Sequence, residues 1–172
     1  MNRRDLLGIA ALTVSVLGLA VLPGNATEQQ RSPKEQLLGT WALVSIDAVR
    51  QDGGRSQLFG ASPKGIAMFD GRYYVISVMR SDRAPFAVND RMQGTAEENK
   101  ATSQGTITYF GTYSVSEADR VVLIHIDGSS FPNWNEADQK RLFSLTADEL
   151  KLTVPVPPTG GAAIEVVWRR AN

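Results

Sequence analysis

The chain has 172 residues, with eighteen basic and eighteen acidic side chains, one histidine and no cysteine. The absence of cysteine excludes disulfide bonds, thiol catalysis and Cys-ligated metal sites. The balanced charge argues against a nucleic-acid or anionic-membrane partner, because both require a basic surface.

Residues 1–26 have the three regions of an export signal. Arg3 and Arg4 supply the positive start, an uncharged and mostly apolar run extends to Leu22, and small residues lead to Ala26. We therefore expect cleavage after Ala26 and a periplasmic or secreted mature protein. The alternative is a signal that is retained as a membrane anchor. The arginine pair also resembles a twin-arginine signal, while the general secretion route is the other possibility.

The mature chain is nearly neutral, with sixteen basic and seventeen acidic residues once the two arginines and one aspartate of the signal are removed. Residues 27–36 are polar and contain Pro33, and we expect them to form a flexible lead. Residues 37–172 then form one domain, long enough to enclose a hydrophobic core. No stable membrane span is expected after the signal is removed.

From residue 37 onward, short β-type runs alternate with turn signals. Asp70-Gly71 is a strong hairpin signal between two such runs. Thr95 and Glu98 have the spacing of a helix N-cap and its partner, which predicts one short helix over residues 95–104. The predicted strands are residues 39–50, 63–70, 72–80, 105–117, 120–128, 139–146, 150–156 and 163–170.

Eight strands joined mostly by tight turns fit either an up-and-down antiparallel barrel or a sandwich. We favour the eight-stranded all-β barrel with one short helix. Closure of the sheet removes its edges and leaves an interior that side chains fill or that holds one small ligand.

Eight short motifs strengthen this interpretation by their order along the chain. They are LLGTW (37–41), LFG (58–60), PKG (63–65), MRSDR (79–83), TAEENK (95–100), YFGTYSV (109–115), FPNW (131–134) and DQKR (138–141). They resemble those of the bacterial and fungal lipocalin-like domain family over nearly all of the mature chain. The resemblance implies a lipocalin-type barrel in which Trp41 packs across the closed end. It also implies that the position of Glu136 is often glycine, and that some relatives accompany biosynthetic enzymes for polyketide-like metabolites.

The single histidine, His125, lies in an apolar run. Its neutral imidazole is both a donor and an acceptor, and it changes charge near neutral pH. Both faces of the run are apolar, so alternation does not show which face points inward. An interior His125 would bind a ligand or act as an acid or base. Otherwise it would hydrogen-bond to a neighbouring strand.

Arg141 shares one face of its predicted strand with Phe143 and Leu145. If that face is interior, the guanidinium requires either an acidic side chain or an anionic ligand. The alternative is an arginine at a strand end whose charged group reaches solvent.

Five aromatic residues are further candidates for ligand binding. Tyr109 and Tyr113 share a strand face, and Tyr73 lies across the sheet; such rings form a wall for a moderately polar ligand or simply pack between strands. Phe131 and Trp134 form a corner that either caps the barrel mouth or folds inward as a plug.

We find no hydrolase elbow and no phosphate-binding glycine loop, and one histidine without cysteine does not make a zinc site. No metal or cofactor is therefore expected. The predicted function is binding of a small apolar or amphipathic molecule in the barrel. An isomerase or cyclase that uses His125 as acid or base on a hydrophobic metabolite is the alternative, and a filled, purely structural barrel is a third.

Overall fold

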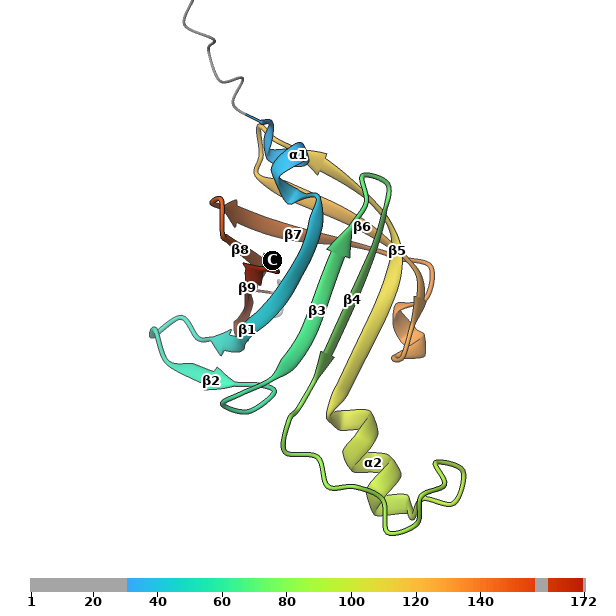
Figure 1. Cartoon of the computed structure of the whole chain (residues 1–172). Helices are drawn as coiled ribbons and strands as arrows, with labels where there is room; N and C mark the ends of the chain where they lie inside the picture. The colour runs from blue at the N-terminus through green and yellow to red at the C-terminus, as the bar shows by residue number, and fades with distance from the viewer. Residues whose placement is uncertain (1–30, 157–160, 172) are drawn as a thin grey trace, which may run out of the picture. The chain divides into compact units, whose positions relative to one another are not determined.

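The computed structural model describes residues 31–156 and 161–171, and Figure 1 shows their arrangement. In these residues one antiparallel sheet has the order β2-β1-β3-β4-β5-β6-β7-β8-β9, and β1 also pairs with β9. The predicted eight-stranded up-and-down barrel is confirmed, with β2 as an additional strand. The strands are β1 (Gly39–Val49), β2 (Arg55–Gln57), β3 (Lys64–Phe69), β4 (Tyr73–Met79), β5 (Thr106–Ser116), β6 (Val121–Ser129), β7 (Ala137–Leu145), β8 (Glu149–Val154) and β9 (Ala163–Arg170).

The predicted signal, residues 1–26, lies outside the described residues. None of the helices described has the length and apolar character that a membrane-crossing helix needs.

The barrel closes where the first strand meets the last. Register pairs run along β1 and β9 from Trp41 and Arg170 to Val49 and Ala163, with one irregularity after Leu43. On its other edge, β1 pairs first with β3 and then with β2. Because β1 has partners on both sides, the closed sheet has no long unpaired edge there.

In the described part of the chain, three helices accompany the strands. Helix α2 (Ala96–Gln104) begins at the predicted cap, where Thr95 and Glu98 exchange side-chain and backbone hydrogen bonds. Helix α1 (Pro33–Leu37) lies at the opposite end of the barrel (Figure 1) and was not predicted, because its residues fall mostly in the expected flexible lead. A second capping box, from Ser32 to Glu35, starts α1. The short 3-10 helix η1 (Pro132–Trp134) forms the corner between β6 and β7.

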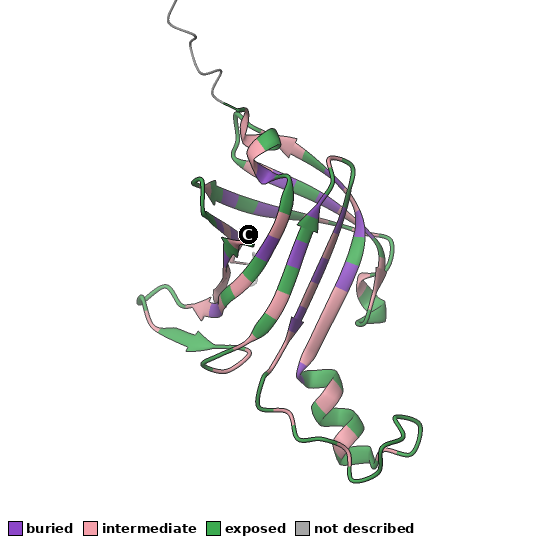
Figure 2. Ribbon diagram, in the orientation of Figure 1, coloured by how far each residue is buried: buried purple, intermediate pink, exposed green. Residues whose placement is uncertain are grey.

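Side chains alternate between the two faces of the sheet, as Figure 2 shows by the succession of buried and exposed residues along each strand. On β6, Val122, Ile124 and Ile126 are buried inside the barrel, so Leu123 and His125 lie on the outer face. Strand β2 was not predicted, because its three residues, Arg-Ser-Gln, are all exposed and show no apolar alternation.

The end of the barrel beside α1 is closed by packing around Trp41, which is fully buried. The Trp41 indole Nε1–H donates to the Leu37 carbonyl at 2.9 Å. The Arg170 guanidinium lies 4.1 Å from the ring centroid of Trp41 and donates to the carbonyls of Gln36, Leu38 and Ala147. The prediction that Trp41 packs across the closed end is therefore confirmed.

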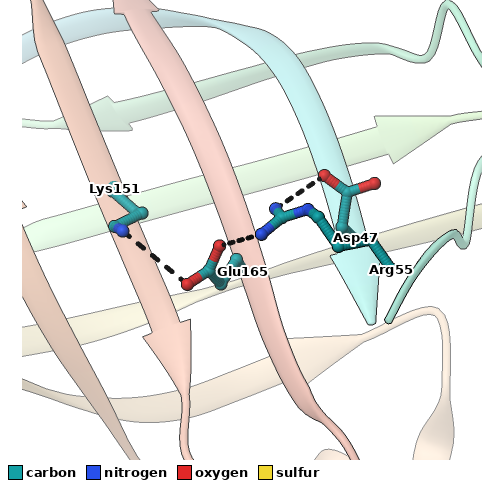
Figure 3. A network of polar contacts seen from close by, with 4 residues as sticks. All are labelled: Asp47, Arg55, Lys151 and Glu165. Atoms are coloured by element: carbon teal, nitrogen blue, oxygen red, sulfur yellow. Dashed lines mark hydrogen bonds and ion pairs between the residues drawn. The ribbon is translucent and has the colours of Figure 1, made fainter. Parts of the chain in front are cut away.

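A chain of charged residues crosses the outer face of β8, β9, β1 and β2 (Figure 3). Arg55 on β2 contacts Asp47 on β1 at 3.1 Å and Glu165 on β9 at 2.9 Å. Lys151 on β8 reaches the other oxygen of Glu165 at 3.6 Å. Asp47 is only 8% exposed, so its carboxylate depends on Arg55 for a cation. Through Arg55, these contacts attach β2 to both β1 and β9 on the outer face of the barrel.

We expect Arg55→Met to lower the urea midpoint of unfolding, because it leaves the nearly buried Asp47 carboxylate without its cation. The matched control is Arg50→Met, since Arg50 and its partner Asp52 are both largely exposed. Equal midpoints for the two variants would contradict a structural role for the Arg55 network.

Candidate functional site

The barrel contains an apolar cavity of about 180 Å³. Its lining comes from β1, β4, β5, β7, β8, β9, η1 and the loop after β2. Arg141 is the one charged residue in this lining. The lining residues are Ile46, Leu58, Phe59, Ile76, Val78, Ile107, Tyr109, Trp134, Arg141, Leu152, Val154, Ile164, Val166 and Trp168.

The rim of the cavity is at the end of the barrel opposite α1. Leu58 and Phe59 belong to the loop after β2, and Trp134 belongs to the η1 corner. Leu58 lines the cavity and is also partly exposed to solvent. Since the other end is closed around Trp41, a ligand would enter between these loops.

Arg141 faces the interior and is only 6% exposed. Its guanidinium donates to the Lys140 carbonyl at 3.0 Å and to the side-chain oxygen of Gln139. Both partners are neutral acceptors, and no salt bridge of Arg141 is found in the described part of the chain. Of the two alternatives, an interior arginine and one that reaches solvent, the structure shows the first.

Trp168 lies on β9 and is 1% exposed. Its indole Nε1–H has no hydrogen-bond partner within residues 31–156 and 161–171. A buried indole N–H usually has an acceptor, because leaving one unpaired costs about 1–3 kcal/mol. Among the described residues, the cavity lining thus contains both a buried cation without a counterion and a buried donor without an acceptor.

Three of the predicted aromatic residues form one side of the cavity and its rim. The Tyr109 and Trp134 rings meet edge to face at 5.5 Å between centroids, and Trp134 meets Phe131 in the same way at 5.8 Å. Tyr109 and Trp134 line the cavity, whereas Phe131 packs behind Trp134 and is partly exposed. The FPNW corner therefore folds inward with its tryptophan.

The other two predicted tyrosines lie away from the cavity. Tyr113 is buried toward the closed end, where its ring packs on Phe69 at 5.1 Å and its hydroxyl accepts a hydrogen bond from the Gly71 amide. Burial raises the pKa of Tyr113. Tyr73 points outward, is 49% exposed, and packs against the Arg72 guanidinium. For both, packing is the interpretation that the geometry supports.

His125 also lies away from the cavity, on the outer face of β6. Its Nδ1 contacts Asp138 on β7 at 2.8 Å, in the register pair that joins the two strands. Its Nε2 lies 3.7 Å from carboxylate oxygens of Asp127 and Glu136. The expected contact with a neighbouring strand is thus observed, and an interior position for His125 is not.

Most of the apolar lining, including Trp168, was not predicted from the sequence. The signal was present on β9, where Ile164, Val166 and Trp168 alternate with Glu165 and Val167. Because the charged Glu165 is expected to face solvent, the alternate residues Ile164, Val166 and Trp168 are expected to face the interior. The loop residues Leu58 and Phe59 gave no such periodicity.

A protein-family model described as "Lipocalin-like domain" matches residues 38–171, which is most of the chain and the whole of the barrel. A search of curated proteins found no match.

The pKa of His125 is raised above its ordinary value, chiefly by the hydrogen bond from its Nδ1–H to Asp138, with the three nearby carboxylates adding to the effect. We expect Asp138→Asn to lower this pKa, measured by NMR on the imidazole of the single histidine. Because the folded-state pKa is the higher one, the interaction stabilises the fold below the unfolded pKa of about 6.5, and the gain is lost as the pH rises through the folded value. Asp119→Asn, remote from His125, is the control; an unchanged pKa in Asp138→Asn would contradict the assignment.

Glu136 has a positive φ of 61°, a conformation that a residue with a side chain adopts at a cost and glycine adopts freely. This is the position at which the family resemblance implies glycine. We expect Glu136→Gly to raise the free energy of unfolding by about 1 kcal/mol. Glu136→Ala is the matched control, because it removes the same carboxylate from His125 but keeps the strained backbone. The expectation fails if alanine stabilises the protein as much as glycine does.

Proposed function

The chain belongs to the lipocalin-like domain family, and from this premise we propose that it is an exported protein that binds a small apolar or amphipathic molecule inside its barrel. The observation that carries the proposal is the apolar cavity with a rim at one end and a closed opposite end. Sites for small molecules are typically concave and apolar with a few polar groups that fix orientation.

The cavity has a lining suited to this role. Aliphatic side chains from β4, β8 and β9 supply apolar surface, and Tyr109 and Trp134 supply rigid rings near the rim. Burial of apolar ligand surface contributes about 25 cal/mol per Å², so that affinity comes mainly from the walls. Arg141 supplies the orienting charge.

Export is part of the proposal and rests on the sequence of residues 1–26. A signal of this type would deliver the barrel to the periplasm or the medium. A barrel without cysteine folds in that oxidising compartment without disulfide bonds, which suits either export route. Expression of the full chain in a bacterial host, followed by fractionation and mass determination of the mature N-terminus, tests the expected cut after Ala26.

The alternative of an isomerase or cyclase gains no support from the geometry. It requires His125 to exchange a proton with a molecule in the cavity. The imidazole lies on the outer face of β6, hydrogen-bonded to Asp138, and the buried side chains of the same strand separate it from the interior. We therefore favour binding over catalysis for the cavity.

Filling the cavity tests the binding function. We expect Val166→Phe, whose larger ring would occupy the empty space, to weaken binding of a small aromatic probe such as indole by about tenfold or more while the barrel stays folded. Binding is measured by isothermal titration calorimetry, because indole fluoresces in the same range as the three tryptophans of the protein and would mask their signal.

Val167→Phe is the control, because Val167 is the next residue on β9 and faces outward. Equal binding by both variants, or no binding of apolar probes by the folded unaltered protein, would count against a ligand in this cavity.

A further inference from the structure

We propose that the ligand of this cavity is a small organic anion of about single-ring size, whose negatively charged group pairs with Arg141 and which also offers an acceptor atom to the Trp168 indole. The inference rests on the proposed binding function and adds the chemical class of the ligand to it.

The first argument is the charge of Arg141. A guanidinium stays protonated in proteins and carries five N–H donors. Within the described residues Arg141 makes only two hydrogen bonds, both to neutral oxygens of nearby residues on β7. A buried charge without a counterion is strongly unfavourable, so a residue of this kind needs an anion from elsewhere.

The neighbouring groups do not supply that anion. Asp47, a nearly buried carboxylate of the barrel, faces outward and is already paired with Arg55 at 3.1 Å. The hydroxyl of Tyr74 is buried inside the barrel, and burial raises its pKa well above the usual range, so that it stays neutral. The remaining partners of Arg141, Gln139 and the Lys140 carbonyl, are uncharged.

The second argument is independent and comes from Trp168. Its side chain is almost fully buried in the cavity lining and its Nε1–H has no acceptor among the described residues. An indole is a donor only, so it selects a ligand atom that accepts a hydrogen bond. An anionic ligand with a hydrogen-bond acceptor would supply a counterion to Arg141 and an acceptor to Trp168, which line the same cavity.

The third argument is size. The cavity measures about 180 Å³. An apolar protein cavity of about 150 Å³ accommodates benzene. The volume therefore suits one ring with a small substituent, and it is too small for a long-chain fatty acid held entirely inside. The aromatic edges of Tyr109 and Trp134 near the rim fit such a ring.

The proposal is tested by comparing a charged ligand with a neutral one of the same shape. Benzoate and nitrobenzene are nearly isosteric, and only benzoate carries a full negative charge at pH 7.5. We expect the unaltered mature protein to bind benzoate at least about tenfold more tightly than nitrobenzene in isothermal titration calorimetry. This comparison requires no variant to fold.

Two variants then test which residues cause the preference for benzoate over nitrobenzene. Arg141→Met keeps the side-chain volume and removes the charge; we expect it to abolish the preference for benzoate, to retain nitrobenzene binding, and to raise the melting temperature of the ligand-free protein, because an unpaired buried charge is gone. Trp168→Phe tests the second contact: reduced benzoate affinity with nearly unchanged nitrobenzene affinity supports an acceptor at the indole N–H, and unchanged benzoate affinity contradicts it.

The outcomes separate this inference from the proposed function. If both probes bind with equal affinity, or if Arg141→Met keeps the preference for benzoate, the anionic ligand class is wrong although the cavity binds small molecules. If neither probe binds to the folded protein, and indole does not bind either, the cavity itself is not a binding site and both proposals fail.

Discussion

The cavity depends on the contact between Arg170 and Trp41, which joins the last strand of the barrel to the first. Arg170 is the last residue of β9, and Trp41 lies near the start of β1. The guanidinium covers the indole ring and donates to carbonyls in α1, in the residue after it and in the β7–β8 turn. One side chain thereby fixes the closing pair of strands and seals the base of the barrel. With the base sealed, the rim of the cavity lies at the other end, beside Leu58, Phe59 and Trp134.

Arg141 shows the opposite relation between an arginine and its surroundings. Arg170 has its donors satisfied by backbone oxygens, and its flat guanidinium stacks on an aromatic face. Arg141 has neither a carboxylate nor an aromatic partner in the described residues, and lies in an apolar wall. Binding sites commonly retain groups that destabilise the empty protein and are satisfied only when the ligand arrives. Arg170 thus stabilises the fold, whereas Arg141 destabilises the ligand-free protein.

Alternation and turn chemistry predicted the eight strands but fitted either a barrel or a sandwich; closure of the sheet edges and the resemblance of the motifs favoured the barrel. Asp70-Gly71 forms the predicted hairpin turn, with Gly71 at a φ of 101°, and Thr95 caps the predicted helix. The orientation of His125 was not predictable, because both faces of β6 are apolar and only the closed sheet decides which is inside. For Arg141 the sequence left two alternatives, an interior guanidinium and one that reaches solvent, and the burial of the residue in the structure shows the first. The partnerless indole of Trp168 required coordinates, because an absent hydrogen bond has no signature in the sequence.

The pairing of β1 with β9 also has a kinetic consequence. The two strands that close the barrel are separated by more than a hundred residues, so their contacts form only after a long loop is ordered. Sheets with such distant pairings fold slowly and expose strand edges while they do so. The barrel cannot be completed while its last strand is still in the ribosome, and until then β1 would need protection from aggregation. If a chain crosses a membrane before it folds, β1 and β9 pair on the far side. If it crosses already folded, the two strands must pair in the cytoplasm first.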